Sequence, residues 1–198
     1  MLKRHKNFLA LTKARKTTYE FSEQDIPKAK ILSILEAARW APSCGNAQPW
    51  HFIIVENKET IKKLLGTTHY IHAPFIHPLP KAVIAFVLPS DRHMHTYFDE
   101  EYTHCCIHSQ CTQHRNEEEL CFAMSVFSST LAATDLGISS CILTPQQDQA
   151  TKLLKTEKMG VVHLLVGLGY EKKGAFQKKR TRRELKDLVS YEYYGRNK

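Results

Sequence analysis

The sequence has no hydrophobic run long enough to cross a bilayer. Its longest apolar runs, Ala82 to Leu88 and Val161 to Leu168, fall well short of the roughly 20 residues that a transmembrane helix needs. The basic N-terminus is followed only by the short apolar stretch Phe8 to Leu11 before charge returns, whereas a secretory signal has a longer apolar core. We therefore expect a cytoplasmic protein with no membrane partner.

Glycine and cysteine patterns exclude further classes. The chain has 8 glycines, and its one Gly-x-Gly, Gly167-Leu168-Gly169, lacks the third glycine of a dinucleotide-binding turn; no P-loop motif is present either. The 6 cysteines do not follow the spacing of a disulfide-rich secreted domain, and 198 residues can bury a core without disulfides. We expect free thiols and a single domain over residues 1–198.

Positive charge is abundant but unevenly placed. The formal net charge is +8, and the excess gathers at the two ends of the chain, most densely in Lys178-Lys179-Arg180-Thr181-Arg182-Arg183. Nucleic-acid-binding segments combine such charges with stacking aromatics or a recognisable module, and neither is found here. We expect no nucleic-acid partner, and interpret the run either as a solvated surface or as a phosphate-binding segment.

Hydrophobic periodicity predicts a chain of mixed helices and strands, without internal repeats. Prolines, glycines and capping residues set the expected boundaries. The expected helices are Phe8–Arg15, Ile26–Trp40 with Asp25 as its cap, Lys58–Leu65, Asn116–Gly137, Gln146–Leu154 and a last one around Leu185–Val189; the expected strands are Phe52–Val55, Ala82–Leu88, Ile138–Leu143 and Val161–Val166.

The helix expected from Asn116 to Gly137 has the most distinctive composition. Asn116 can cap its start, Glu117 to Glu119 complement the helix dipole, and Gly137 can end it. Between Leu120 and Leu136 the residues are apolar or small on nearly every face. Such a helix is buried, so we expect it at the centre of the domain or at a subunit interface.

The segment Ala41-Pro42-Ser43-Cys44-Gly45-Asn46-Ala47-Gln48-Pro49-Trp50 joins a predicted helix to a predicted strand. Small residues let a backbone approach a ligand closely, and amides offer both donors and acceptors. The same residue types are common in ordinary turns. The segment is therefore either a loop that binds a polar ligand or a turn that ends a helix. Trp50 is expected in the core.

Three segments in order resemble the FMN-dependent nitroreductase family. The first, Phe8-x-x-Leu11-x-x-x-Arg15-Lys16-Thr17-x-Tyr19-x-Phe21, is similar to the family's N-terminal helix and its Arg-Arg-Ser-x-Arg-x-Phe segment. The second is the loop just described, similar to Pro-Ser-small-x-Asn-x-Gln-Pro-Trp. The third is Val166-Gly167-Leu168-Gly169-Tyr170, followed by the basic run and Glu184-Leu185-x-x-Leu188-Val189. The resemblance implies an α+β nitroreductase-like fold, with a central, mostly antiparallel sheet flanked by helices, in an intertwined homodimer.

The resemblance also implies a tightly but non-covalently bound FMN. Planar guanidinium groups suit a phosphate dianion, and the resemblance gives Arg15, Arg180 and Arg182 as phosphate and ribityl ligands. The Thr17 hydroxyl and the Lys16 backbone lie beside them in the family. The other implied flavin neighbours are Tyr19, the strand end Ile142, Leu143 and Thr144, and, from the partner subunit, Pro42, Ser43, Cys44, Asn46 and Gln48.

The chemistry implied by the resemblance needs no catalytic side chain, because hydride transfer belongs to flavin N5. NAD(P)H would reduce the flavin, and a small electron-poor substrate, such as a nitroaromatic or a quinone, would be reduced in a second half-reaction. Three residues depart from the family pattern: Tyr19 replaces a cation, Cys44 replaces a small residue or serine, and Pro145 lacks an N–H near N5. An alternative function is therefore an FMN-binding protein without turnover, as a sensor or store.

The polar stretch at about 90–116 is rich in histidine and cysteine. Its core, His104-Cys105-Cys106-Ile107-His108 followed by Cys111 and His114, lacks the paired cysteine knuckles of zinc sites, and adjacent cysteines do not easily ligate one ion. We expect a lid or partly helical insert and no metal. A metal-binding protein is the other alternative function.

Overall fold

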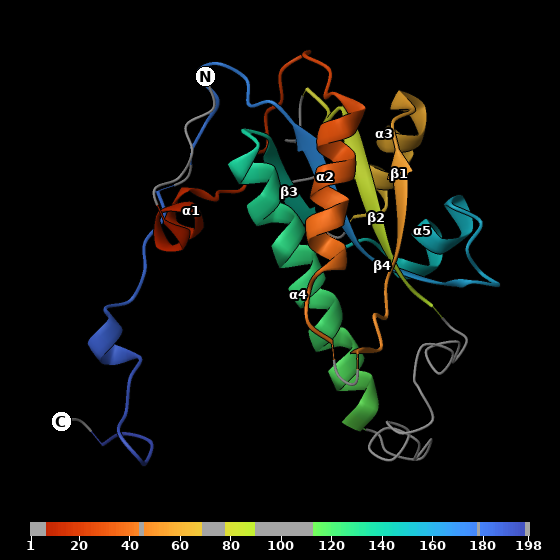
Figure 1. Cartoon of the computed structure of the whole chain (residues 1–198). Coiled ribbons are helices and arrows are strands. Elements are labelled where there is room, and N and C mark those ends of the chain that lie inside the picture. The colour runs from red at the N-terminus through yellow and green to blue at the C-terminus, as the bar shows by residue number, and fades with distance from the viewer. Residues whose placement is uncertain (1–6, 44–45, 69–77, 90–112, 178, 197–198) are drawn as a thin grey trace.

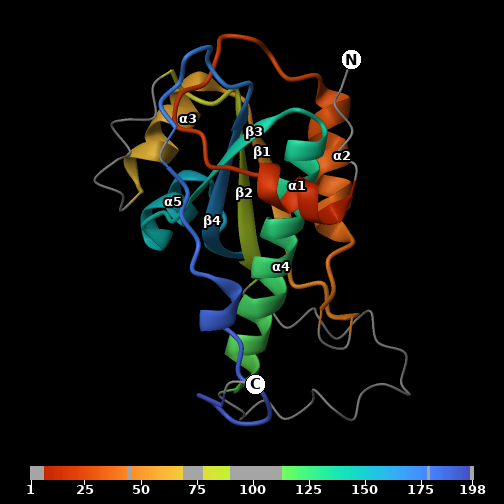
Figure 2. The same ribbon diagram turned by 90° about the vertical axis from the view of Figure 1, so that its left-hand side faces the viewer.

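A four-stranded antiparallel sheet lies between two layers of helices (Figures 1 and 2). The computed structural model describes residues 7–43, 46–68, 78–89, 113–177 and 179–196. The strand order is β1-β2-β4-β3, and every neighbouring pair is antiparallel. The strands are β1 (His51–Val55), β2 (Ala82–Pro89), β3 (Ser139–Leu143) and β4 (Gly160–Gly169), and the helices are α1 (Phe8–Ala14), α2 (Lys28–Arg39), α3 (Lys58–Gly66), α4 (Gln113–Asp135) and α5 (Gln147–Leu153).

Strand β2 shows why the sheet is covered on both faces. Its residues are apolar without alternation, as in strands buried on both sides. Val83, Ala85 and Val87 pack on the α3 and α5 side, whereas Ile84 and Phe86 pack on the α2 and α4 side. The expected α+β architecture is confirmed.

Local capping chemistry accounts for some of the helix ends. Asn57 accepts a hydrogen bond from the Thr60 N–H at 2.9 Å at the start of α3. Gly137, at φ +72°, ends α4 as expected, because the N–H groups of Gly137 and Ile138 donate to the carbonyls of Thr134 and Ala133. None of the described helices is long and apolar enough to span a membrane.

Three expectations about helix boundaries are wrong. Asp25 does not cap α2; Pro27 occupies that position without a side-chain cap, and the Asp25 carboxylate lies 3.5 Å from Lys81 Nζ. Asn116 is inside α4, which begins at Gln113, so Glu117 to Glu119 are not in its first turn; a helix already formed by packing extends at one hydrogen bond per added residue. The last helix is only a 3-10 turn, Leu185–Asp187, because its apolar side chains are exposed in the single chain and have nothing to pack on.

Candidate functional site

The segment after α1 is fixed against the edge strand β3. The Thr18 N–H donates to the Ser140 carbonyl at 3.0 Å, and Thr17 and Ser140 form a parallel bridge. Further on, Phe21 is fully buried above Gly169, where an added Cβ would lie only 2.6 Å from the Phe21 ring. This anchoring gives Arg15, two residues before Thr17, a defined place beside the sheet.

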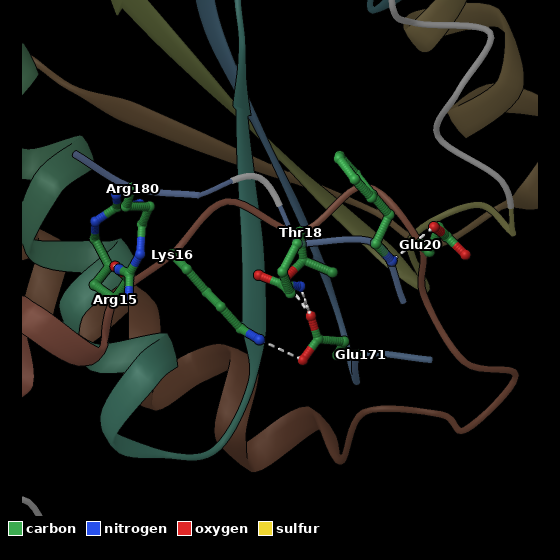
Figure 3. Close-up of polar contacts among 8 residues, drawn as sticks. Arg15, Lys16, Thr18, Glu20, Glu171 and Arg180 are labelled. Carbon is green, nitrogen blue, oxygen red and sulfur yellow. Dashed lines mark hydrogen bonds and ion pairs between the residues drawn. The ribbon is translucent and has the colours of Figure 1, made fainter. Parts of the chain in front are cut away.

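Three arginines from the two ends of the chain meet at this place, and Figure 3 shows two of them, Arg15 and Arg180, side by side. Arg180 Nη1 donates a hydrogen bond to the Arg15 carbonyl, and Arg182 is close enough for its charge to act on Arg15. The pKa of Arg15 is lowered, first by burial and then by the charges of Arg180 and Arg182. None of the ion pairs found among the described residues involves these arginines. The cluster therefore carries like charges, and a bound anion would reduce the repulsion between them.

A surface pocket of about 390 Å³ opens at the same place. It is lined by Thr12, Lys13, Arg180 and Arg182. Thr12 and Lys13 were not expected in the site from sequence. Thr12 precedes Arg15 by three residues at the end of a helix, so helical spacing would have placed it on the same side.

Lys16 has a different role from the arginines. Its Nζ lies 2.5 Å from Glu171 Oε2, so its charge is already neutralised by a carboxylate just after β4. The expectation that Lys16 contributes its backbone to the site is compatible with this pairing. Glu171 itself was missed, because nothing in the local sequence joins residues that are 155 positions apart.

The strand end expected beneath a flavin ring is partly exposed. Ile142 is 36% exposed on β3. Tyr19, two residues after the bridge between Thr17 and Ser140, packs against the core cluster on the α3 and α5 side. Thr144 is exposed, but Leu143 is buried in the core on the α3 and α5 side, so only its backbone can face a ligand. The site thus has a cationic end near Arg15 and an apolar end near Ile142, on the order of 13 Å apart at strand spacing.

Pro145 is buried and forms a bridge with Thr68. The following N–H, that of Gln146, donates to the Thr67 carbonyl at 2.6 Å. Neither residue therefore offers a backbone donor to a ligand at this end of β3. Cys141, on the same strand, is a buried free thiol whose pKa is raised to about 12 by burial.

The loop after α2 is held by its own hydrogen bonds. Ser43 Oγ accepts from the Gln48 N–H at 3.0 Å, and the Asn46 N–H donates to the Ser43 carbonyl. Asn46 and Gln48 have φ of +56° and +50°, a strained conformation that often marks functional loops. Trp50 packs against the core on the α2 and α4 side.

One chain does not bring this loop to the arginines. The loop lies near the N-terminal half of α4, whereas α1 lies beside the other half (Figures 1 and 2). Pro42 is exposed and Ser43 is half-buried. Cys44 and the stretch 90–112 lie outside the described residues; among those described, no group of three or more His, Cys, Asp and Glu side chains is placed to hold a metal ion.

Fold and site together define an α+β domain with an anion-attracting cleft at one sheet edge. The model of the nitroreductase family matches residues 12–98. A protein of Archaeoglobus fulgidus, assigned by name as an NADH dehydrogenase/NAD(P)H nitroreductase, is 31% identical over 169 residues, covering 83% of this chain and 85% of the relative. The chain therefore belongs to the nitroreductase family.

Solved structures agree on the fold. A nitroreductase family protein of Streptococcus pneumoniae TIGR4 superposes with a TM-score of 0.77 at 21% identity, covering 93% of this chain and all of that one. A protein described as an FMN-dependent nitroreductase, from Clostridium difficile R20291, superposes with a TM-score of 0.69 at 18% identity, covering 94% of this chain and 100% of that one. At these identities the likeness concerns the fold alone.

Proposed function

We propose that this protein is an FMN-dependent oxidoreductase that takes hydride from NAD(P)H and reduces a small electron-poor substrate. The observation that carries the proposal is the meeting of Arg15, Arg180 and Arg182 without an acidic partner among the described residues, with the exposed Ile142 roughly 13 Å away at strand spacing. A ligand with a phosphate at one end and a flat apolar ring at the other fits this donor set. Family membership supports the same assignment.

Cationic residues would bind the phosphate end of FMN, and apolar residues would bind its ring. The three arginines would hold the phosphate, with the Thr17 hydroxyl as a further donor, while Ile142 would lie along the ring and the backbone at Tyr19 would border it. Bound FMN supplies the hydride-accepting N5, so the side chains bind, orient and exclude water. Tyr19 brings no positive charge to the ring, which lowers the expected flavin potential relative to a site with arginine or lysine there.

The proposal is tested by the colour and reduction of the purified protein. We expect a yellow protein whose flavin absorbance is bleached by NADH or NADPH without oxygen and recovers when a nitroaromatic or a quinone is added. A yellow protein that neither nucleotide bleaches would instead support an FMN-binding protein without turnover. A colourless protein that does not take up added FMN would overturn the proposal.

A second copy of the chain would complete the site. Leu120, Met124 and Phe127 form one exposed apolar face of α4, and Phe8 and Leu9 of α1 are exposed as well; monomeric proteins rarely leave such apolar areas uncovered. The C-terminal segment leaves the sheet (Figure 1) with Leu185 and Leu188 exposed. In a homodimer these surfaces would be covered, and Ser43 and Asn46 of the partner subunit would reach the flavin.

Charge placed on the exposed face of α4 is expected to disrupt this dimer. The double change Leu120→Glu and Phe127→Glu should give a folded monomer by light scattering with weakened FMN binding, because burying two carboxylates in an apolar interface is costly. Met159→Glu is the matched control, since Met159 is equally exposed, at 66% against 64% for Leu120, but lies before β4. A monomeric wild-type protein would contradict the proposed dimer.

A further inference from the structure

Two carboxylates hold the start of the C-terminal segment against the segment that follows α1 (Figure 3). Glu171 binds Lys16 at 2.5 Å and accepts a hydrogen bond from the Gln177 side chain; the Thr18 hydroxyl lies 3.5 Å away. Glu20 Oε1 accepts from the Phe176 N–H at 3.0 Å. One carboxylate, that of Glu171, therefore joins both segments that carry the arginines.

Few other contacts determine where Arg180 lies. Between 177 and 184, within the part of the chain that the structure describes, two side-chain hydrogen bonds reach the body of the domain: Gln177 to Glu171 and Arg180 to the Arg15 carbonyl. Among the described residues, the hydrogen bonds of the Arg182 and Arg183 side chains stay within their own segment. Because the residues there are exposed and lack regular secondary structure, the Gln177–Glu171 contact is the last anchor before Arg180, one residue beyond the Phe176–Glu20 bond.

Before an anion arrives, the like charges of the arginine cluster favour a contact that holds the basic segment in place. The pKa of Arg15 is lowered first by burial and then by the charges of Arg180 and Arg182, so these like charges oppose the assembly of the cluster. Glu171 neutralises the neighbouring Lys16 and holds Gln177 at the same time. The cluster is then assembled without waiting for the ligand, which lowers the ordering cost of binding.

We propose that Glu171 is a positioning residue that pre-organises Arg180 for the phosphate group of FMN. The proposal rests on the proposed FMN site. Glu171 acts through Arg180 and touches no ligand itself. Its effect should therefore be specific to the phosphate end of the ligand and should disappear once Arg180 is absent.

The test compares FMN with riboflavin, which has the same ring but no phosphate. Glu171→Ala should raise the Kd for FMN about tenfold and leave the Kd for riboflavin within twofold. Glu171→Gln keeps an oxygen that can accept from Gln177, so it should recover part of the loss. Glu23→Ala is the matched control, because Glu23 also pairs with a distant lysine, Lys81, at 2.9 Å, and it should leave both constants unchanged.

A double-mutant cycle separates positioning from an independent contribution. The double variant Glu171→Ala and Arg180→Met should bind FMN no more weakly than Arg180→Met alone. Fully multiplied losses, equal losses for riboflavin, or an unchanged FMN Kd in Glu171→Ala would each overturn the proposal for Glu171. Failure of the wild-type protein to bind FMN would overturn the proposed function, and this proposal with it.

Discussion

Replacing both Arg15 and Arg180 by methionine is expected to weaken FMN binding by a factor on the order of 100 without destabilising the apoprotein. Hydrogen bonds to charged groups contribute about 1.5–3 kcal/mol each, and each 1.4 kcal/mol corresponds to a factor of about ten. Methionine keeps much of the aliphatic packing of the arginine stem. The pKa of Arg15 is lowered first by burial and then by the charges of Arg180 and Arg182, so the double change removes both a partly buried charge and this repulsion, and the apoprotein should be at least as stable as the wild type.

The measurement is the rise in unfolding free energy that FMN produces. At a concentration of 100 Kd, a ligand stabilises the folded state by about 2.7 kcal/mol. At the same FMN concentration the double variant would gain only about 0.4 kcal/mol, and riboflavin should distinguish the two proteins far less.

Arg183→Met is the matched control for this experiment. Arg183 belongs to the same basic run, but its guanidinium donates to the Asp187 carbonyl instead of joining the cluster. It should bind FMN as the wild type does. A loss in Arg183→Met equal to that in the double variant would mean that general positive charge, and not the cluster, attracts the ligand.

Phe86→Ala is expected to lower the free energy of unfolding by about 3–5 kcal/mol. Phe86 is fully buried at the centre of β2, and its ring packs edge-on against Phe52 at 5.2 Å and Phe122 at 5.8 Å. It therefore joins β1 and α4 across the middle strand, and its loss opens a cavity and removes two aromatic pairs. Urea unfolding followed by circular dichroism measures the change.

Two further variants make the Phe86 result decisive. Phe86→Leu fills most of the space and should cost clearly less, so it gives a measurement if the alanine variant does not fold. Phe176→Ala removes a ring that is 73% exposed and should change stability by less than about 0.5 kcal/mol. A loss below about 1 kcal/mol in Phe86→Ala would contradict the central role of this ring.

Most of the sheet and its helices could be predicted from local sequence. The unbroken apolar run of β2 and the spacing of Ile31, Ile34 and Ala38 in α2 reflect positions that face the core. Boundaries were less secure: Asp25 has the right chemistry for a cap but pairs with Lys81, and Asn116 lies inside α4. A capping residue favours the start of a helix at its position, but tertiary packing determines where the helix begins.

The residue types of the candidate site could be predicted from the sequence, but the contacts between its distant residues could not. The segment around Arg15, the loop around Ser43 and the basic run were each visible because their residues are neighbours in the chain. Their relation was not, since the Lys16–Glu171 and Arg15–Arg180 contacts join residues 155 and 165 positions apart. Glu171 carries no local signal of its role.

The sequence by itself determined the order of helices and strands, the apolar faces and the presence of cations at both ends, because these depend on residues close together in the chain. Only the tertiary structure decided that Arg15, Arg180 and Arg182 meet while Lys16 is neutralised by Glu171. It also decided that the Ser43 loop and the arginines lie apart in one chain (Figure 1). Contacts between distant segments form only where the packed sheet brings them together, and local periodicity does not encode that geometry.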